Sequence, residues 1–179
     1  MSVSFFLSLY FLKNDRNETI ASIIMIKIMF VCHGNICRSP MAEFIFKDLL
    51  KKEGLQDKFF VSSSATSTEE IWNGIGNPVY PPAKAELARH GISCEGKRAV
   101  QLSPFDYDKY DLFIGMDSMN IRNMHRILGG APENKIRKLM EYTERGGDVA
   151  DPWYSGRFDV AYRDIYDGCE GLADYLING

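Results

Sequence analysis

The ten residues from Val31 to Pro40, VCHGNICRSP, constrain the fold of this chain more than any other feature. They follow an apolar run at residues 26–31, which predicts a buried strand. Ser39 and Pro40 are typical of a helix N-cap and of the first helical position. A strand-to-helix turn of this kind directs backbone N–H groups into one concavity, and the helix N-terminus adds its positive dipole end. The stretch is therefore predicted to bind an anion.

The residue types in this turn place a nucleophile beneath the anion. Gly34 and Asn35 tolerate the positive φ angles that such a loop needs. The guanidinium of Arg38 would hold a tetrahedral dianion, and the same positive field would favour the thiolate of Cys32. The hydroxyl of Ser39 could hydrogen-bond that thiolate. A thiolate beneath a bound phosphoryl group is in line to attack phosphorus.

The string Val-Cys-x-Gly-Asn-x-Cys-Arg-Ser-Pro resembles the phosphate-binding loop of low-molecular-weight protein tyrosine phosphatases. The resemblance runs from about Ile26 to the end of the chain. It implies hydrolysis of phosphotyrosine and small aryl phosphates through a phosphocysteine intermediate on Cys32, with no metal or cofactor. An ordinary glycine turn with two buried thiols is one alternative. A metal site is another, but Cys32 and Cys37 lack further ligands at zinc-like spacing.

The pattern of apolar runs predicts the fold. Strands are expected at residues 26–32, 59–63, 111–116 and 136–140. Helices are expected at residues 39–53, 82–90, 117–128 and from 158 onward. This alternation, in a chain of 179 residues, predicts an α/β single domain built on a doubly wound sheet of about four parallel strands, with helices on both faces. The anion site is expected at the carboxyl ends of the strands.

A second motif, Asp151-Pro152-Trp153-Tyr154, lies far along the chain. A residue before proline is held extended, which would fix the carboxylate of Asp151 in a rigid loop. The resemblance implies that Asp151 protonates the leaving oxygen and later activates water. It also implies that Trp153 and Tyr154 flank a phenyl ring, which favours phosphotyrosine over phosphoserine. An ordinary Asp-Pro turn is the alternative.

Further residues are candidates for support of the loop and for substrate binding. The support candidates are Asn35, Ser39 and Ser63, where the resemblance implies a hydrogen bond between Ser63 and the loop asparagine. The substrate-binding candidates are His33, Gly34, Ile36, Cys37, Trp72, Trp153 and Tyr154. Cys37 would also protect an oxidised Cys32 by forming a disulfide with it. Relatives often carry a histidine under the loop, and Lys97 or Arg98 stands in that region here.

Composition narrows the partners and the compartment. A net charge of −3 and the lack of a basic stripe argue against nucleic acid as a partner. Four cysteines without a secretory signature indicate a reducing compartment, so a cytoplasmic location is expected. The resemblance implies tyrosine-phosphorylated proteins as partners, and inorganic phosphate or other oxyanions as inhibitors.

Residues 1–24 are predicted to be an N-terminal extension without a catalytic role, and residues 25–179 the phosphatase domain. The apolar run Phe5–Leu12 is too short to span a bilayer, and no basic residue precedes it as in a signal peptide. Met25 would be a normal start for a chain of this kind. An extra helix packed on the domain and a weak membrane-surface anchor are the alternatives.

Three other functions share parts of the pattern. Protein-arginine phosphatases share the fold and the loop, but they carry threonine at the position of Ile36, which is expected on the rim of the loop against the group attached to phosphorus. Arsenate reductases share the loop and rely on a resolving cysteine pair, and only Cys94 lies in the corresponding region. A phosphate-binding module without catalysis is the third, and the intact Cys32, Arg38 and Asp151 argue against it.

Overall fold

The computed structural model describes residues 25–129 and 135–178, so the predicted extension at residues 1–24 lies outside the described residues. One sheet has the strand order β2-β1-β5-β6 and all its pairs are parallel. Its strands are β1 (Ile26–Cys32), β2 (Phe59–Ala65), β5 (Leu112–Gly115) and β6 (Ile136–Lys138). A separate two-stranded hairpin consists of β3 (Ile71–Trp72) and β4 (Ile75–Gly76).

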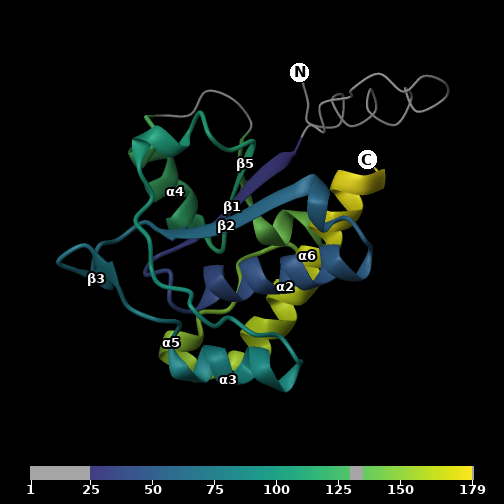
Figure 1. The fold of residues 1–179 in the computed structure, drawn as a ribbon, viewed down its shortest axis with the longest axis horizontal. Coiled ribbons are helices and arrows are strands. Elements are labelled where there is room, and N and C mark those ends of the chain that lie inside the picture. Colours follow the sequence, from purple (N-terminus) through teal and green to yellow (C-terminus); the bar gives the residue numbers. More distant parts are fainter. Residues whose placement is uncertain (1–24, 130–134, 179) are drawn as a thin grey trace.

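Helices cover both faces of the sheet (Figure 1). The α-helices are α2 (Arg38–Lys52), α3 (Pro81–Arg89), α4 (Ser118–Ile127), α5 (Pro152–Ser155) and α6 (Phe158–Asn178). Short 3₁₀ turns lie at η1 (Gln56–Lys58), η2 (Pro104–Asp106) and η3 (Leu139–Tyr142). The larger core lies between the sheet and α2, α3 and α6, while a smaller core lies under α4. The predicted doubly wound α/β fold is confirmed.

The burial of residues 28–32 explains why this part of β1 is apolar without alternation, whereas Lys27 near the start of the strand is exposed. Ile28 and Phe30 face the larger core, and Met29 and Val31 face the smaller one. A central parallel strand with both faces covered must be apolar at every position. The fully buried Phe30 packs edge-on against Phe46 of α2, with ring centroids 5.7 Å apart, which holds α2 to the sheet.

The order of the strands places a crevice at the end of β1. The chain runs from β1 outward to β2 and then crosses back to β5 on the other side of β1. The connections after β1 and β5 therefore leave the carboxyl edge of the sheet in different directions, and ligands bind at such points in open α/β sheets. Among the described residues, none of the helices combines the length and the apolar character needed to cross a bilayer.

Three local predictions differ from the structure. The run at 136–140 is a strand only as far as Lys138, and its last residues enter η3. The predicted strand 59–63 extends to Ala65, because it stays paired with β1 up to Cys32. Ser39 is not the N-cap of α2: Cys37 takes that place, and Ser39 lies inside the helix with its hydroxyl directed at the loop.

Candidate active site

A cleft of about 450 Å³ opens over the loop between β1 and α2. The predicted site residues that line it are Cys32, His33, Gly34, Ile36, Cys37, Arg38, Asp151, Trp153 and Tyr154. Within residues 25–129 and 135–178, no three His, Cys, Asp or Glu side chains gather in a way that could hold a metal ion. The cleft brings the predicted acid Asp151 to the loop that carries Cys32 and Arg38, although Asp151 lies far from that loop in the chain.

The sulfur of Cys32 lines this cleft and makes two hydrogen-bond contacts. The backbone N–H of Asn35 donates to Cys32 Sγ at 3.3 Å, and the hydroxyl of Ser39 lies 3.0 Å from the same sulfur. Asn35 adopts φ = 56°, the left-handed conformation that turns its N–H back toward the sulfur. These contacts hold the sulfur at the entrance to α2, next to the backbone N–H of the loop.

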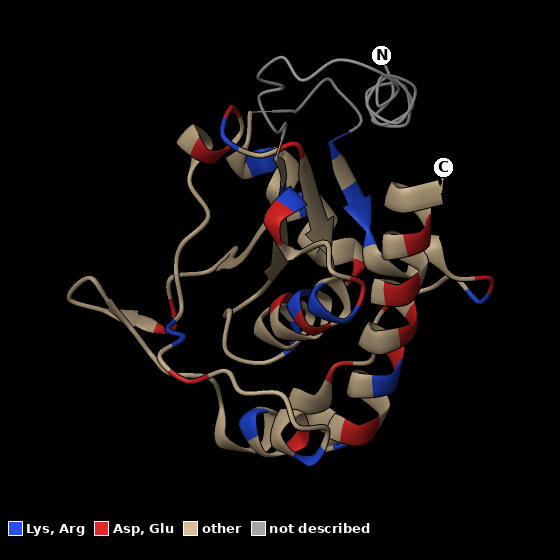
Figure 2. Cartoon of the chain, turned by 45° about the vertical axis from the view of Figure 1, so that its right-hand side comes forward, with Lys and Arg blue, Asp and Glu red and all other residues tan. Residues whose placement is uncertain are grey.

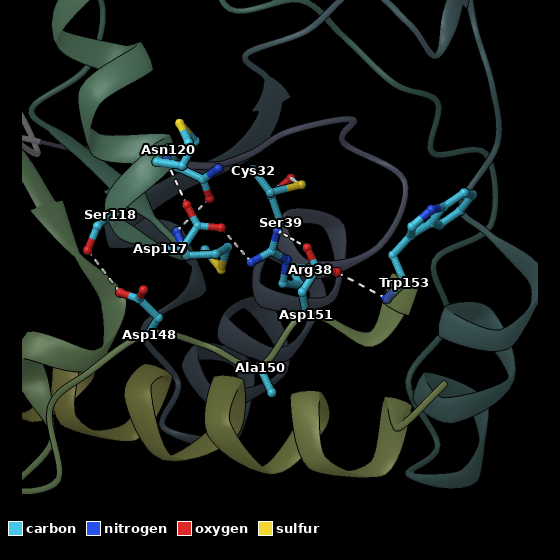
Figure 3. Close-up of polar contacts among 12 residues, drawn as sticks. Cys32, Arg38, Ser39, Asp117, Ser118, Asn120, Asp148, Ala150, Asp151 and Trp153 are labelled. Atoms are coloured by element: carbon cyan, nitrogen blue, oxygen red, sulfur yellow. Dashed lines mark hydrogen bonds and ion pairs between the residues drawn. The ribbon is translucent and has the colours of Figure 1, made fainter. Parts of the chain in front are cut away.

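Arg38 is fixed between two carboxylates (Figure 3). Its Nη1 donates to Asp117 Oδ2 and its Nη2 to Asp151 Oδ2, each at 2.7 Å. Burial alone would lower the pKa of Arg38, but the negative groups of Cys32, Asp151 and Asp117 raise it above its ordinary value. The guanidinium is thus a permanent, oriented cation beside the sulfur, as binding of a phosphoryl group requires.

A hydrogen-bonded chain of side chains supports the loop from below. Asn35 Nδ2 donates to Ser39 Oγ at 2.9 Å and to Ser63 Oγ at 2.8 Å. The backbone N–H of Val100 donates to Asn35 Oδ1 at 3.0 Å, so both ends of the amide are engaged. These are the three residues predicted to support the loop, and all three are buried.

An ion pair of Glu43 and Lys97 lies against Ser63 of this chain of side chains. Ser63 Oγ donates to Glu43 Oε2 at 2.6 Å, and Lys97 Nζ lies 3.0 Å from that same oxygen. Lys47 Nζ lies 2.5 Å from the other oxygen of Glu43. Burial would raise the pKa of Glu43, but Lys97, Lys47 and Ser63 together lower it. Of the two residues considered for this region, Lys97 contacts Glu43 and the carbonyl of Ser63, whereas Arg98 donates to the carbonyl of Gly76 at 2.9 Å.

Replacing Lys97 by methionine is expected to lower the free energy of unfolding by about 1–3 kcal/mol, because a buried carboxylate loses one of its two cations. The pKa of Glu43 is lowered in the folded state, so this stabilisation is present above the unfolded value of about 4.3 and is lost as the pH falls through the folded value. The measurement is the free energy of unfolding in urea for the native chain and for Lys97→Met. The difference between them should be present at pH 7 and should shrink below pH 4. Lys47→Met is the control and should cost less than about 1 kcal/mol, since the ammonium group of Lys47 is partly exposed. Equal losses in both variants would contradict the assignment.

The loop that carries Asp151 is held in an extended form as predicted. Asp151 has φ = −86° and ψ = 108°, and its Oδ1 accepts the N–H of Trp153 at 3.0 Å, which caps α5. The preceding N–H, of Ala150, donates to Asp164 Oδ2 of α6 at 3.0 Å. The ring of Trp153 packs against Tyr80, with centroids 5.2 Å apart. These contacts fix the direction in which the carboxylate points.

Two predicted substrate-binding residues lie elsewhere than expected. Trp72 does not line the cleft: it lies on the hairpin with 71% of its surface exposed, because the short strand β3 turns away from the loop. Ile36 is not on an open rim. Only 8% of it is exposed, since it packs in the larger core while part of it still lines the cleft.

Five residues of the cleft were not predicted as site residues: Glu69, Glu70, Asp117, Met119 and Asn120. Asp117 begins the predicted helix 117–128, and it caps α4 by accepting the N–H of Asn120 at 2.7 Å. A signal for it existed, because Asp117 follows a strand whose carboxyl end must lie at the same edge as the end of β1. Glu69 and Glu70 lie in an irregular loop, where sequence carries no such signal.

A parallel α/β sheet with a Cys-x5-Arg loop at its carboxyl edge and a carboxylate in the same cleft is the arrangement expected of a phosphatase with a cysteine nucleophile. Residues 27–178 match the family described as low molecular weight phosphotyrosine protein phosphatase. The chain belongs to this family, as the loop string predicted.

Named relatives agree with this membership. The low molecular weight protein-tyrosine-phosphatase YfkJ of Bacillus subtilis (strain 168) is 42% identical over 150 residues, which cover 83% of this chain and 94% of that protein. The crystal structure of YfkJ has a TM-score of 0.82 at 39% identity, covering 89% of this chain and 98% of that one. The structure of SP-PTP from Streptococcus pyogenes has a TM-score of 0.75 at 35% identity, with coverage of 85% and 93%. The crystal structure of DARP, a drosophila arginine phosphatase, has a TM-score of 0.74 at 28% identity, and the match covers 84% of this chain and 98% of that one.

Proposed function

We propose that this phosphatase hydrolyses phosphotyrosine in proteins, and small aryl phosphates, in two steps. The thiolate of Cys32 attacks phosphorus, the bond from phosphorus to the phenolic oxygen breaks, and the carboxylic acid of Asp151 gives that oxygen its proton. Water then attacks the phosphocysteine while Asp151 takes a proton from it, which releases inorganic phosphate and restores the thiolate. The observation that carries the proposal is that one cleft is lined by Cys32, Arg38 and Asp151, with Arg38 2.7 Å from Asp151.

Charge stabilisation in this mechanism comes from Arg38 and the amides of the loop. As the bond to the leaving oxygen breaks, charge spreads over the equatorial oxygens of the phosphoryl group, where fixed donors are most effective. Arg38 is nearly buried, and its contacts with two carboxylates fix the position of the guanidinium in the cleft. The departing cysteine sulfur is stabilised in the second step by the same contacts from Ser39 and Asn35 that hold it before reaction.

The walls of the cleft support an aryl ester as substrate. Trp153 and Tyr154 form one wall, and the apolar side chain of Ile36 contributes to the floor. A phenyl ring gains from burial between such groups, and aromatic pairs add about 0.5–1.5 kcal/mol each. The cleft has the volume for a phenyl phosphate, whereas phosphoserine would leave the aromatic wall without a contact.

A protein-arginine phosphatase is the second candidate, and the acidic lining of the cleft is the observation that favours it. Glu69, Glu70, Asp117 and Asp151 all line the cleft, and carboxylates suit a guanidinium group. The structural similarity to the drosophila arginine phosphatase points the same way. Against it, Ile36 offers no hydrogen bond at the floor of the cleft, and an unpaired guanidinium is costly to desolvate.

The variant Ile36→Thr distinguishes the two candidates. We expect the native chain to prefer phosphotyrosine peptides over phosphoarginine peptides, and the variant to narrow that preference by about tenfold, because threonine adds a hydroxyl where a guanidinium would otherwise be unpaired. The measurement is kcat/KM for both peptides on both proteins. Because Ile36 is largely buried, thermal unfolding must first show that the variant is folded. A native preference for phosphoarginine would make the second candidate the function.

Cys37 is proposed to protect the nucleophile from irreversible oxidation. Burial, together with Cys32 and Asp151, raises the pKa of the Cys37 thiol to about 12. Oxidation of Cys32 by peroxide to a sulfenic acid removes one of these negative charges, which makes Cys37 easier to ionise. Its sulfur can then attack the sulfenic sulfur, forming the disulfide and releasing water.

Peroxide inactivation should therefore be reversed by a thiol reductant in the native chain and much less so in Cys37→Ser. The expected difference is the fraction of aryl phosphatase activity regained after equal exposure to peroxide. Mass spectrometry of the oxidised native chain should show Cys32 joined to Cys37. A disulfide from Cys32 to Cys94 or Cys169 would refute the assignment, and Cys94→Ser serves as the matched control.

The compartment and partners follow from the same chemistry. All four cysteines are free and buried in the structure, and a nucleophilic thiolate requires a reducing environment. We therefore place the enzyme in the cytoplasm, with tyrosine-phosphorylated proteins as partners and inorganic phosphate or other oxyanions as competitive inhibitors. Hydrolysis of nitrophenyl phosphate by the purified chain, inhibited by phosphate, is the direct test. Binding of phosphate without turnover would leave only a phosphate-binding module.

A further inference from the structure

One carboxylate of helix α6 is buried outside the cleft. Figure 2 shows acidic positions along this helix, which ends at the C-terminus. Among the described residues of α6, Asp164 is the only acidic one that is buried, with 7% of its surface exposed. It does not line the cleft. A buried carboxylate is costly unless it is paired and hydrogen-bonded, so the partners of Asp164 show what it stabilises.

Both oxygens of Asp164 bind the segment that leads to the proposed general acid. Oδ2 accepts the N–H of Ala150 at 3.0 Å, and Oδ1 pairs with Nη2 of Arg145 at 2.7 Å. Gly146 and Gly147 lie between these two contacts, with φ angles of 61° and 86°. Glycine loses more conformational freedom on ordering than any other residue, so such a segment needs contacts from outside to hold one conformation. Asp164 supplies one contact at each end of it.

The position of Asp151 depends on the contact between Asp164 and Ala150. Ala150 is the residue directly before Asp151, and the proline that follows holds Asp151 extended, at φ = −86° and ψ = 108°. Figure 3 shows Ala150 next to helix α6 and Asp151 directed at Arg38. The backbone at Asp151 is therefore held on one side by its proline and on the other by α6.

Proton transfer to a leaving group is sensitive to such positioning. A displacement of about 1 Å in a catalytic group can cost about a hundredfold in rate. The loss falls on substrates that need the proton, such as phosphotyrosine, whereas a nitrophenolate leaves with little protonation. A residue that positions Asp151 should therefore matter for phosphotyrosine and much less for nitrophenyl phosphate.

We propose that Asp164 is a positioning residue for the general acid, which acts on Asp151 through Ala150 and is itself held by Arg145. Without the Asp164 carboxylate, the N–H of Ala150 loses its acceptor and the carboxylic acid of Asp151 turns away from the leaving oxygen. Attack by the thiolate and binding of phosphate are left in place, because the guanidinium of the loop keeps its contact with Asp117. The inference rests on the proposed phosphotyrosine phosphatase activity, with Asp151 as the acid.

The test compares kcat/KM of the full chain for phosphotyrosine and for nitrophenyl phosphate, since this ratio reports the steps up to departure of the leaving group. Asp164→Ala should lower kcat/KM about 10- to 100-fold for phosphotyrosine and less than about threefold for nitrophenyl phosphate. Asp164→Asn keeps an oxygen that can accept the N–H of Ala150 and loses the ion pair. It should recover most of the loss, to within about fivefold of the native chain, and Arg145→Met should match it.

A double variant separates positioning from a merely structural role. Asp164→Ala combined with Asp151→Asn should have the same kcat/KM for phosphotyrosine as Asp151→Asn alone, because no acid is then left to be positioned. A residue that only stabilises the fold would instead add its own loss to that of Asp151→Asn.

Asp159→Ala is the matched control. Asp159 lies on the same helix, pairs with Arg157 at 2.8 Å and does not line the cleft. Its removal should leave the ratio of the two kcat/KM values unchanged. Because Asp164 is buried, thermal unfolding must first show that Asp164→Ala is folded. If it is not, Arg145→Met decides the question, since the side chain of Arg145 is 60% exposed and its substitution should keep the fold.

Several outcomes would overturn the proposal and leave the proposed function intact. They are an equal loss for both substrates in a folded Asp164→Ala, native kcat/KM in that variant, and additive losses in the double variant. Where Asp164→Ala does not fold, an equal loss or no loss in Arg145→Met has the same meaning. Failure of the native chain to hydrolyse nitrophenyl phosphate, or an equal effect of Asp151→Asn on both substrates, would instead reject the proposed function or its acid.

Discussion

Replacing Cys32 by serine is expected to lower kcat by roughly 10⁴-fold or more, as does loss of the nucleophile in other covalent hydrolases. A serine hydroxyl fits the space between Ser39 and the N–H of Asn35, but it is not ionised at neutral pH and cannot attack phosphorus as a thiolate does. The loop, its donors and Arg38 stay in place. Binding of inorganic phosphate should therefore persist, which calorimetry on the purified variant would show.

Cys37→Ser is the control for this substitution, since it changes a buried thiol in the same loop. It should keep most of the activity toward nitrophenyl phosphate. The proposed mechanism does not survive if Cys32→Ser retains substantial activity that phosphate inhibits. An unfolded Cys32→Ser variant would also be inactive. Circular dichroism of the variant must therefore show a native spectrum before its loss of activity supports the mechanism.

Asp151→Asn is expected to slow release of tyrosine by about 10²- to 10⁴-fold, and release of nitrophenol far less. Tyrosine, with a pKa near 10, needs a proton to leave, whereas a nitrophenolate leaves with little protonation. Asparagine keeps the side-chain oxygen that accepts the N–H of Trp153, so α5 should remain capped. The measurement is the pre-steady-state release of each leaving group, under conditions where phosphorylation of Cys32 limits the rate.

Asp117→Asn is the matched control, because Asp117 and Asp151 contact Arg38 at the same distance of 2.7 Å. The variant Asp117→Asn weakens one of the two contacts that hold the guanidinium of Arg38. It leaves Asp151, the proposed proton donor to the leaving group, unchanged. It should therefore affect both substrates by the same factor. If Asp151→Asn also affects both equally, the general acid is a different residue.

The fold could be predicted where the pattern of buried apolar residues is typical of a strand or of a helix alone. The run at 26–32 is apolar at successive positions, which only a strand covered on both faces requires. At 136–140 the same reasoning failed, because Leu139 and Met140 are buried in a 3₁₀ turn and apolar character does not report backbone form. The hairpin falls between the predicted strand 59–63 and the predicted helix 82–90, and no strand was predicted there, although Asn73-Gly74 is a recognised turn signal.

The site was predictable where its residues are neighbours in the chain. Cys32, Asn35, Arg38 and Ser39 occupy one turn, so their types alone define the chemistry. Asp151 was predicted by resemblance, because it lies 113 residues from Arg38 and no local pattern links the two. The contact of Asp117 with Arg38 was missed for the same reason, across 79 residues.

The two carboxylates around Arg38 also affect how anions arrive. The single guanidinium charge faces Asp117 and Asp151 at hydrogen-bonding distance, so the cleft presents little positive potential at long range. Rapid capture of charged ligands depends on such potentials and falls steeply with ionic strength. Glu69 and Glu70 also line the cleft, so its carboxylates outnumber the guanidinium, and the capture of free phosphate should be slow at low salt and should rise as salt screens the repulsion. Selection among anions then takes place on contact, where neighbouring groups of the ligand can be distinguished.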